Sequence, residues 1–240
     1  MRVAAISDIH GNLPALEAVL ADIERERVDS VVVVGDTIIG PSPVEVFDLV
    51  TGLGAHVVRG NAEDEVVGRS TRFGLLATWC ADLLGDERLS RADAWPLTLE
   101  LRVEGLGRVL VCHSTPASDE PIYTRITPEN DLRQVLGPVD ADVLLCGHTH
   151  MQYDRTLSTG LRVVNPGSVG MPYEGKRGAF WALLGLDGVE FRSTEYDVEA
   201  AAAAMRSSGA PDIDELQVRH LLDPPDSDAT TGYFETLRGA

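Results

Sequence analysis

The chain has 240 residues, 44% of them hydrophobic, and a formal net charge of −18 at pH 7. This length fits one domain or one domain with a small appendage. An acidic surface repels a phosphate backbone, which argues against a general nucleic-acid platform. There is no apolar run of about 18 residues and so no predicted membrane span. The sequence opens on a strand-like segment without a signal peptide, so we expect a cytoplasmic protein.

The first sixty residues alternate short apolar runs with amphipathic segments. The pattern predicts strands at 2–7, 31–34 and 56–59 and helices at 12–27 and 43–50. Asn12 is the expected cap of the first helix, and Pro43 suits the first turn of the second. This β-α-β-α-β order predicts right-handed crossovers and a parallel sheet.

The rest of the chain departs from this rhythm. Residues 62–95 are expected to form a helical insertion, whose role as a substrate cap or an oligomer interface stays open. Further strands are predicted at 97–103, 108–112 and 143–146, with a helix at 128–136. A second, more antiparallel sheet is expected from 152–157, 161–164, 179–186 and 189–196. Helices near 198–206 and 213–222 would complete one domain over 1–222, and the composition of 223–240 predicts a loose C-terminal tail.

Polar residues able to bind metals follow several of the apolar runs. They are Asp8, His10, Asp36, Asn61, His113, His148 and His150, and they include four of the six histidines. In open α/β sheets, ligands bind at the carboxyl ends of strands, so we expect these groups at one edge of the fold. One zinc ion takes about four ligands. Seven groups suit two divalent ions about 3.5–4 Å apart, with a bridging hydroxide able to attack phosphorus in line.

Taken singly, each of these residues has an ordinary explanation. Asp8 could cap a helix, His113 could be a packed histidine, and Asn61 could be a turn residue. These readings fail because the groups occur together. His56 and His220 fit no motif and are interpreted as structural or exposed.

Other residues keep ordinary roles as the first interpretation. The three cysteines lack a CxxC spacing and are expected to be buried free thiols. The Asn165-Pro166-Gly167 segment is first a turn, and it could also border the metal cleft. Contact with a substrate phosphate is a second interpretation for the following residues: Arg59, Arg125, Tyr173, Lys176 and Arg177.

The ordered set of motifs resembles the calcineurin-like metallophosphoesterase superfamily over about residues 2–196. The matching motifs are D-x-H (Asp8, His10), G-D (Gly35, Asp36), G-N (Gly60, Asn61), an isolated His113 and G-H-x-H (Gly147 to His150). The segment Asn165 to Val169 and the short length are similar to its small prokaryotic phosphodiesterase-like branch. The resemblance implies an α/β fold, a four-layer αββα sandwich with two mixed β-sheets.

The resemblance also implies a ligand set for each of two ions. Asp8, His10, Asp36 and His150 would hold the first ion, and Asp36, Asn61, His113 and His148 the second, with Asp36 bridging. Asp36, Asn61 and His113 are therefore expected to be catalytic, around a hydroxide nucleophile. The family usually binds Mn²⁺, Fe, Zn²⁺ or Ni²⁺ here, and Mn²⁺ is the expected cofactor.

One position departs from the family pattern. Many members read G-N-H-[DE], whose histidine contacts phosphate or protonates the leaving group, whereas this chain reads Gly60-Asn61-Ala62-Glu63-Asp64. Ala62 cannot donate a proton, and general acid catalysis is typically worth about 10²–10⁴-fold. We therefore expect esters with good leaving groups, such as aryl phosphodiesters, to be the better substrates.

The leading hypothesis is a binuclear metal-dependent phosphodiesterase acting on a small phosphate ester. The alternative is a phosphomonoesterase of the same fold, including a protein phosphatase, and the choice depends on pocket shape. A non-catalytic protein-binding scaffold is a distant alternative, because a scaffold would be expected to have lost ligands. The oligomeric state stays open, a homo-oligomer included.

Overall fold

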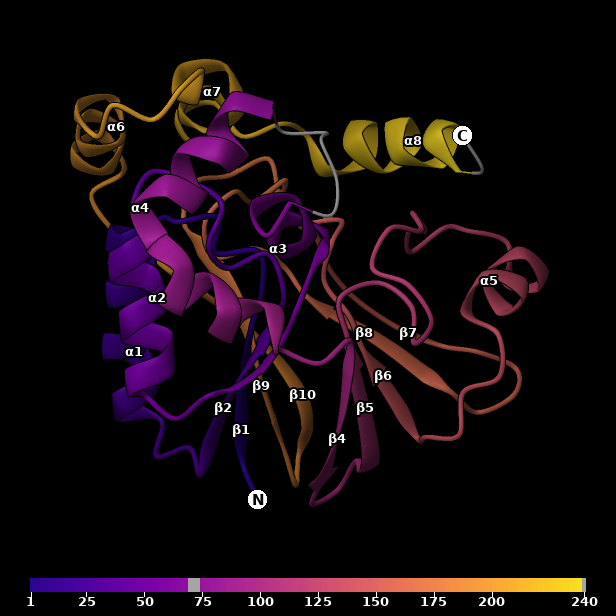
Figure 1. The fold of residues 1–240 in the computed structure, drawn as a ribbon. Coiled ribbons are helices and arrows are strands. Elements are labelled where there is room, and N and C mark those ends of the chain that lie inside the picture. The colour runs from indigo at the N-terminus through magenta and orange to yellow at the C-terminus, as the bar shows by residue number, and fades with distance from the viewer. Residues whose placement is uncertain (69–73, 239–240) are drawn as a thin grey trace.

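A computed structural model describes residues 1–68 and 74–238 as two five-stranded sheets packed face to face, with helices outside them (Figure 1). One sheet has the strand order β10-β9-β1-β2-β3 and the other β4-β5-β6-β8-β7. The first sheet is formed by β1 (Val3–Ile6), β2 (Ser30–Val34), β3 (His56–Val58), β9 (Ala179–Gly185) and β10 (Gly188–Thr194). The second is formed by β4 (Thr98–Val103), β5 (Gly107–Cys112), β6 (Val143–Leu145), β7 (Gln152–Thr156) and β8 (Arg162–Pro166).

Both sheets are mixed, as expected. In the first, β1, β2 and β3 pair in parallel, and β9 pairs antiparallel with β1. In the second, β5, β6 and β8 are parallel, while β4 and β7 are antiparallel at the two edges. The sandwich predicted from the motifs is confirmed.

The composition of the second sheet was predicted wrongly. The strands at 179–186 and 189–196 do not join 152–157 and 161–164, because β9 and β10 extend the first sheet beside β1. The second sheet instead contains β4, β5 and β6. Sequence patterns identify a hairpin such as β9-β10, but the sheet that it joins depends on which buried faces meet in three dimensions.

Side-chain alternation along the strands builds the layers. In β1, Val3 and Ala5 belong to the buried cluster between the two sheets, whereas Ala4 and Ile6 belong to the cluster under α1 (Leu13–Arg25) and α2 (Pro43–Gly52). On the far side of the second sheet, α5 (Glu129–Leu136) contributes Leu132 to another cluster. The order of layers is therefore helix, sheet, sheet, helix.

The cap of α1 and the proline at the start of α2 are present as the sequence predicted. The side chain of Asn12 accepts a hydrogen bond from the backbone N–H of Ala15, and proline stands in the first turn of α2. The expected helical insertion is present as α3 (Asn61–Val66) and α4 (Gly74–Asp93), and residues 69–73 of the predicted segment lie outside the described residues. Within the described ranges, no helix is long and apolar enough to cross a bilayer. All three cysteines are free and buried, as predicted.

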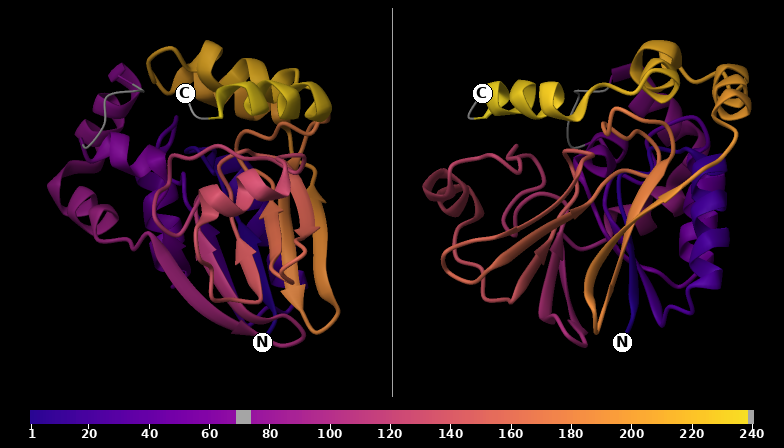
Figure 2. Two further views of the ribbon diagram at one scale, coloured as in Figure 1. Left: turned by 90° about the vertical axis from the view of Figure 1, so that its right-hand side faces the viewer. Right: turned by 180° about the vertical axis from the view of Figure 1, so that it is seen from behind.

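The C-terminal region contains α6 (Val198–Ser207), a π-helix η1 (Asp214–Val218), α7 (Arg219–Leu222) and α8 (Ser227–Leu237). The prediction of a loose tail over 223–240 was wrong, because α8 forms there. Asp226 caps it by accepting the backbone N–H of Ala229 at 2.8 Å. Ion pairs from Asp228 to Arg125 and from Arg238 to Asp131 tie it to the loop before α5 and to α5 itself. Figure 2 shows α8 lying across the end of the sandwich that is opposite the N-terminus.

Candidate metal centre

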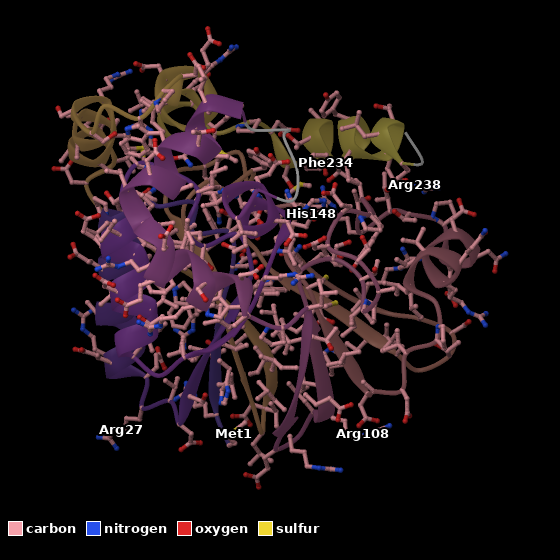
Figure 3. The ribbon with its side chains drawn as sticks, viewed as in Figure 1. Met1, Arg27, Arg108, His148, Phe234 and Arg238 are labelled. Carbon is pink, nitrogen blue, oxygen red and sulfur yellow. The ribbon has the colours of Figure 1, made fainter. Side chains whose placement is uncertain are left out.

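The seven candidate ligands meet at the carboxyl ends of the strands. Asp8 and His10 follow β1, Asp36 follows β2, and Asn61 begins α3 directly after β3. His113 follows β5, and His148 and His150 follow β6. Both sheets therefore contribute, and Figure 3 places His148 at the same end of the molecule as Phe234 of α8. All seven groups therefore lie at one edge of the fold, which is the position expected from the sequence.

The backbone of this edge is unusual. Five of the seven residues have positive φ although none is glycine: Asp8 52°, His10 48°, Asp36 52°, His148 70° and His150 59°. Such conformations cost about 1–3 kcal/mol each and cluster at functional sites. Backbone hydrogen bonds hold some of them, including the N–H of Asp8 to the carbonyl of Gly35 at 3.1 Å. Four of the five belong to one cluster of buried ligand atoms, so the unusual backbone coincides with the candidate site.

One group consists of Asp8, His10, Asp36 and His150, whose ligand atoms lie within 4.8 Å of one another. The Nε2 atoms of His10 and His150 are 3.1 Å apart. His150 Nε2 is 3.2 Å from Asp8 Oδ1. All four residues are buried.

The second group consists of Asp36, His113 and His148, again within 4.8 Å of one another. Asn61 joins it, with Oδ1 3.1 Å from His113 Nε2. His148 faces His113 through Nδ1, at 3.2 Å from His113 Nε2. This group therefore combines imidazole, carboxylate and amide oxygen donors.

Asp36 connects the two groups through its two oxygens. Oδ1 lies 3.3 Å from His113 Nε2, and Oδ2 lies 3.6 Å from His10 Nε2. Each oxygen thus faces a different set of donors, which is the arrangement a shared carboxylate needs.

Two histidines are oriented by backbone carbonyls. His113 Nδ1 is 2.8 Å from the carbonyl of Val34, and His150 Nδ1 is 2.7 Å from that of Met171. A proton on each Nδ1 leaves Nε2 with its lone pair facing the cluster, as in the outer shell of metal sites.

The chemistry of the donors fits transition metals. Mixed imidazole and carboxylate donors suit Mn, Fe and Zn ions. Asp8 Oδ2 is buried and has no hydrogen-bond partner among the described groups. A buried carboxylate oxygen without a partner requires an explanation, and a bound cation supplies one.

Electrostatics support the same assignment. Burial lowers the pKa of His10 to about 4 and that of His148 to about 3, so both imidazoles are neutral at pH 7, the form that binds metals. Burial also disfavours a charged His113, but the carboxylate of Asp36 beside it raises the pKa of His113 to about 10. Despite burial, His113 in turn holds the pKa of Asp36 well below its usual range. The centre thus favours positive charge next to Asp36.

Glu63 organises the site and was not identified from the sequence. Its buried carboxylate accepts hydrogen bonds from the backbone N–H groups of Asp36, Thr37, Ile38 and Gly60, at 2.9, 2.7, 3.2 and 2.7 Å. It thereby ties the loop after β2 to the start of α3. Burial and the charge of Asp36 raise the pKa of Glu63 to about 7. The available signal was an acid three residues after Gly60 at a helix start.

Position 62 contributes a backbone group to the centre. Ala62 is fully buried in the same apolar cluster as Ile39 and Leu76, and its backbone N–H donates to Asp36 Oδ1 at 2.9 Å. The polar group that this residue offers to the centre is therefore its N–H. A histidine here would have to displace packed apolar side chains.

An open pocket lies over the centre. Its floor contains His10, Asp36, Asn61, His148 and His150. Its walls are largely apolar: Ile39, Leu76, Ile122, Met171, Tyr173, Leu216, Phe234 and Leu237. These wall residues come from α4, η1 and α8 as well as from loops, so both the helical insertion and the C-terminal helices border the site. Of the described residues that line it, none is lysine or arginine.

The remaining sequence candidates have structural partners. Arg59 pairs with Asp64 at 3.4 Å, Arg125 with Asp228 and Arg177 with Glu199. Lys176 lies over the ring of Phe180.

Tyr173 is the one predicted loop contact that lines the pocket, and its ring stacks on His150 with centroids 4.7 Å apart. His220 packs edge-on against Tyr173, and His56 is exposed. The side chain of Asn165 is buried and donates to the carbonyl of Gly147, which supports the GHTH segment.

The two-sheet sandwich, with an Asp/His cluster at its strand ends, defines a metallophosphoesterase-type protein. Residues 1–187 match the profile of the calcineurin-like phosphoesterase superfamily domain, and the chain belongs to this superfamily.

Two proteins of related sequence and one solved structure are similar to most of the chain. It is 28% identical over 224 residues to the uncharacterised protein MJ0912 of Methanocaldococcus jannaschii, covering 83% of this chain and 89% of that protein. It is 26% identical over 194 residues to the phosphodiesterase YfcE of Escherichia coli K12, covering 76% and 87%. The crystal structure of a metallophosphoesterase from Sphaerobacter thermophilus superposes with a TM-score of 0.74 at 28% identity, covering 93% of this chain and 99% of that one.

Proposed function

We propose that this chain is a phosphodiesterase that uses two divalent metal ions, Mn²⁺ first among them, to hydrolyse a small phosphate ester. Asp8, His10, Asp36 and His150 would hold one ion, and Asp36, Asn61, His113 and His148 the other. Two bound ions would supply positive charge that activates water and neutralises the phosphoryl oxygens. The observation that carries the proposal is the position of Asp36, with one oxygen toward each group of donors.

The protein groups then have separable tasks. The carbonyls of Val34 and Met171 orient the two Nε2 donors, and Glu63 holds the loop that carries Asp36. The apolar walls limit water around the reacting phosphate, which strengthens electrostatic interactions at the floor. Because Phe234 and Leu237 line the pocket, the proposed catalytic domain extends past residue 222 to include α8.

The lining of the pocket supports a diester over a monoester as the proposed substrate. A monoester dianion carries one more negative charge, and no described lining side chain is cationic to balance it. A diester carries a second organic group, which the apolar walls can accept. The phosphodiesterase activity in the name of the YfcE relative supports the same choice.

The first prediction concerns metal dependence. Metal-stripped protein should lose at least about 100-fold of its activity toward bis(4-nitrophenyl) phosphate, because loss of even outer-shell groups costs about 10–100-fold. Added Mn²⁺ should restore it, and elemental analysis of the reloaded protein should approach two ions per chain. A firm stoichiometry of one, unchanged in Asn61→Ala, would refute the second metal position.

The second prediction concerns ester class. With Mn²⁺ loaded, kcat/KM for bis(4-nitrophenyl) phosphate should exceed that for 4-nitrophenyl phosphate by about tenfold or more, since none of the described side chains that line the pocket is cationic and could balance the extra charge of the monoester. The two esters share a leaving group, so the comparison isolates the remaining substituent and charge. A preference for the monoester would instead support the phosphomonoesterase alternative.

A further inference from the structure

The pocket has one wall built by residues after β10, beyond the segment that matches the superfamily profile. It consists of Leu216 and Gln217 from η1 and of Phe234 and Leu237 from α8. Apart from Gln217, these side chains are half-buried, so part of each apolar surface opens into the pocket. Gln217 is buried and donates from Nε2 to the carbonyl of His10 at 2.9 Å, while its Oε1 is buried and has no hydrogen-bond partner in the part of the chain that the structure describes.

Aromatic rings connect this wall to the metal centre. Tyr173 stacks on His150 with an interplanar angle of 19° and centroids 4.7 Å apart. Phe234 also lies near Tyr173, with its ring centroid 6.0 Å from that of Tyr173 and the two rings tilted by 45°. The row of rings therefore starts at a candidate metal ligand and ends on α8, bordering the space next to a phosphate held at the centre.

Neighbouring residues of α8 fix the position of Phe234. Thr231, which is 2% exposed, donates its hydroxyl to Met151 Sδ at 3.3 Å. Glu235 accepts hydrogen bonds from the hydroxyls of Thr124 and Thr127. Residues three to four apart share a helix face, so the contacts at 231 and 235 hold Phe234 beside the pocket. Tyr233 is 60% exposed and does not line the pocket, although its ring centroid is 6.1 Å from that of Phe234.

We propose that Tyr173, together with Leu216, Phe234 and Leu237 of this wall, forms a subsite for a flat aromatic substituent on the ester phosphate. An aromatic group can pack on these rings and on the two leucines without leaving a polar group unpaired. A methyl or a charged substituent gains little from the same surface. The inference rests on the proposed function, because the phosphate must sit at the metal centre for its substituent to reach the wall.

The test compares two diesters with the same leaving group, 4-nitrophenyl phenyl phosphate and methyl 4-nitrophenyl phosphate. The Mn²⁺-loaded wild type should favour the phenyl ester in kcat/KM by about tenfold, the scale of an aromatic packing contact. In Phe234→Ala this ratio should fall to within about threefold of one, and Phe234→Leu should be intermediate. Tyr233→Ala, on the same helix, should retain the wild-type ratio.

The outcomes separate the two proposals. If both esters are hydrolysed with equal kcat/KM, or if Phe234→Ala keeps the wild-type ratio, the proposed subsite is wrong while the proposed phosphodiesterase activity stands.

If neither ester is hydrolysed, the proposed function fails, and a binding experiment then tests the subsite. Calorimetric titration of the Mn²⁺-loaded protein with phenylphosphonate and methylphosphonate should show tighter phenyl binding that Phe234→Ala removes. Equal affinities would overturn the subsite. A circular dichroism melt of each variant checks that α8 and the fold persist.

Discussion

Asp36→Asn should lower kcat/KM toward a phosphodiester by more than about 10³-fold, the upper range for loss of one pre-organised electrostatic group. Asp36 is buried, and its two oxygens face His113 and His10 on opposite sides. An amide has one oxygen and an NH₂ group. Asparagine at this position could therefore bind the ion of one ligand group but could not bridge both ions. The variant should therefore also bind both metal ions more weakly.

Metal content by elemental analysis after gel filtration, measured beside the activity, checks both parts. His56→Ala is the matched control, because His56 is exposed at the start of β3 and takes no part in the centre. It should retain near wild-type activity and metal content. If the two variants had equal activity and metal content, the bridging assignment of Asp36 would be wrong.

Glu63→Ala should destabilise the metal-free protein by about 3–5 kcal/mol. The substitution removes the acceptor for four backbone N–H groups, and each buried unsatisfied group costs about 1–3 kcal/mol, partly relieved where water enters. The loops carrying Asp36 and Asn61 would lose their common anchor, so activity should fall as well. Glu63→Gln should not rescue the site, because its NH₂ group would face N–H donors on one side.

Urea unfolding without added metal measures this effect separately from the stabilisation that a bound ion provides. Glu17→Ala is the control, since Glu17 is exposed on α1 and should change the free energy of unfolding by less than about 0.5 kcal/mol. Equal unfolding free energies for the two variants would show that Glu63 does not anchor the loops.

The positive φ angles and Glu63 belong to one physical arrangement. Strained backbone conformations persist only where several surrounding contacts hold them in place. The carboxylate of Glu63 accepts the N–H of Asp36, and Asp36 is one of the strained residues. Loss of Glu63 should therefore reach the metal ligands through the backbone.

The sequence by itself determined the early strands and helices, the family and the residues of the candidate centre. Local rules were sufficient for these features: apolar runs predict buried strands, Asn12 caps a helix, and ligand residues follow strand ends in a recognisable order. The buried state of the cysteines followed in the same way.

Only the tertiary structure decided which sheet β9 and β10 join, what the C-terminal residues do and what covers the centre. Strand pairing between β9 and β1 joins segments far apart in the chain, and no local pattern encodes it. The polar composition of 223–240 suggested a loose tail, but ion pairs and hydroxyl contacts with residues 124–131 stabilise α8. Phe234 lines the pocket because this long-range docking brings it beside Tyr173, and such proximity is a property of the packed fold.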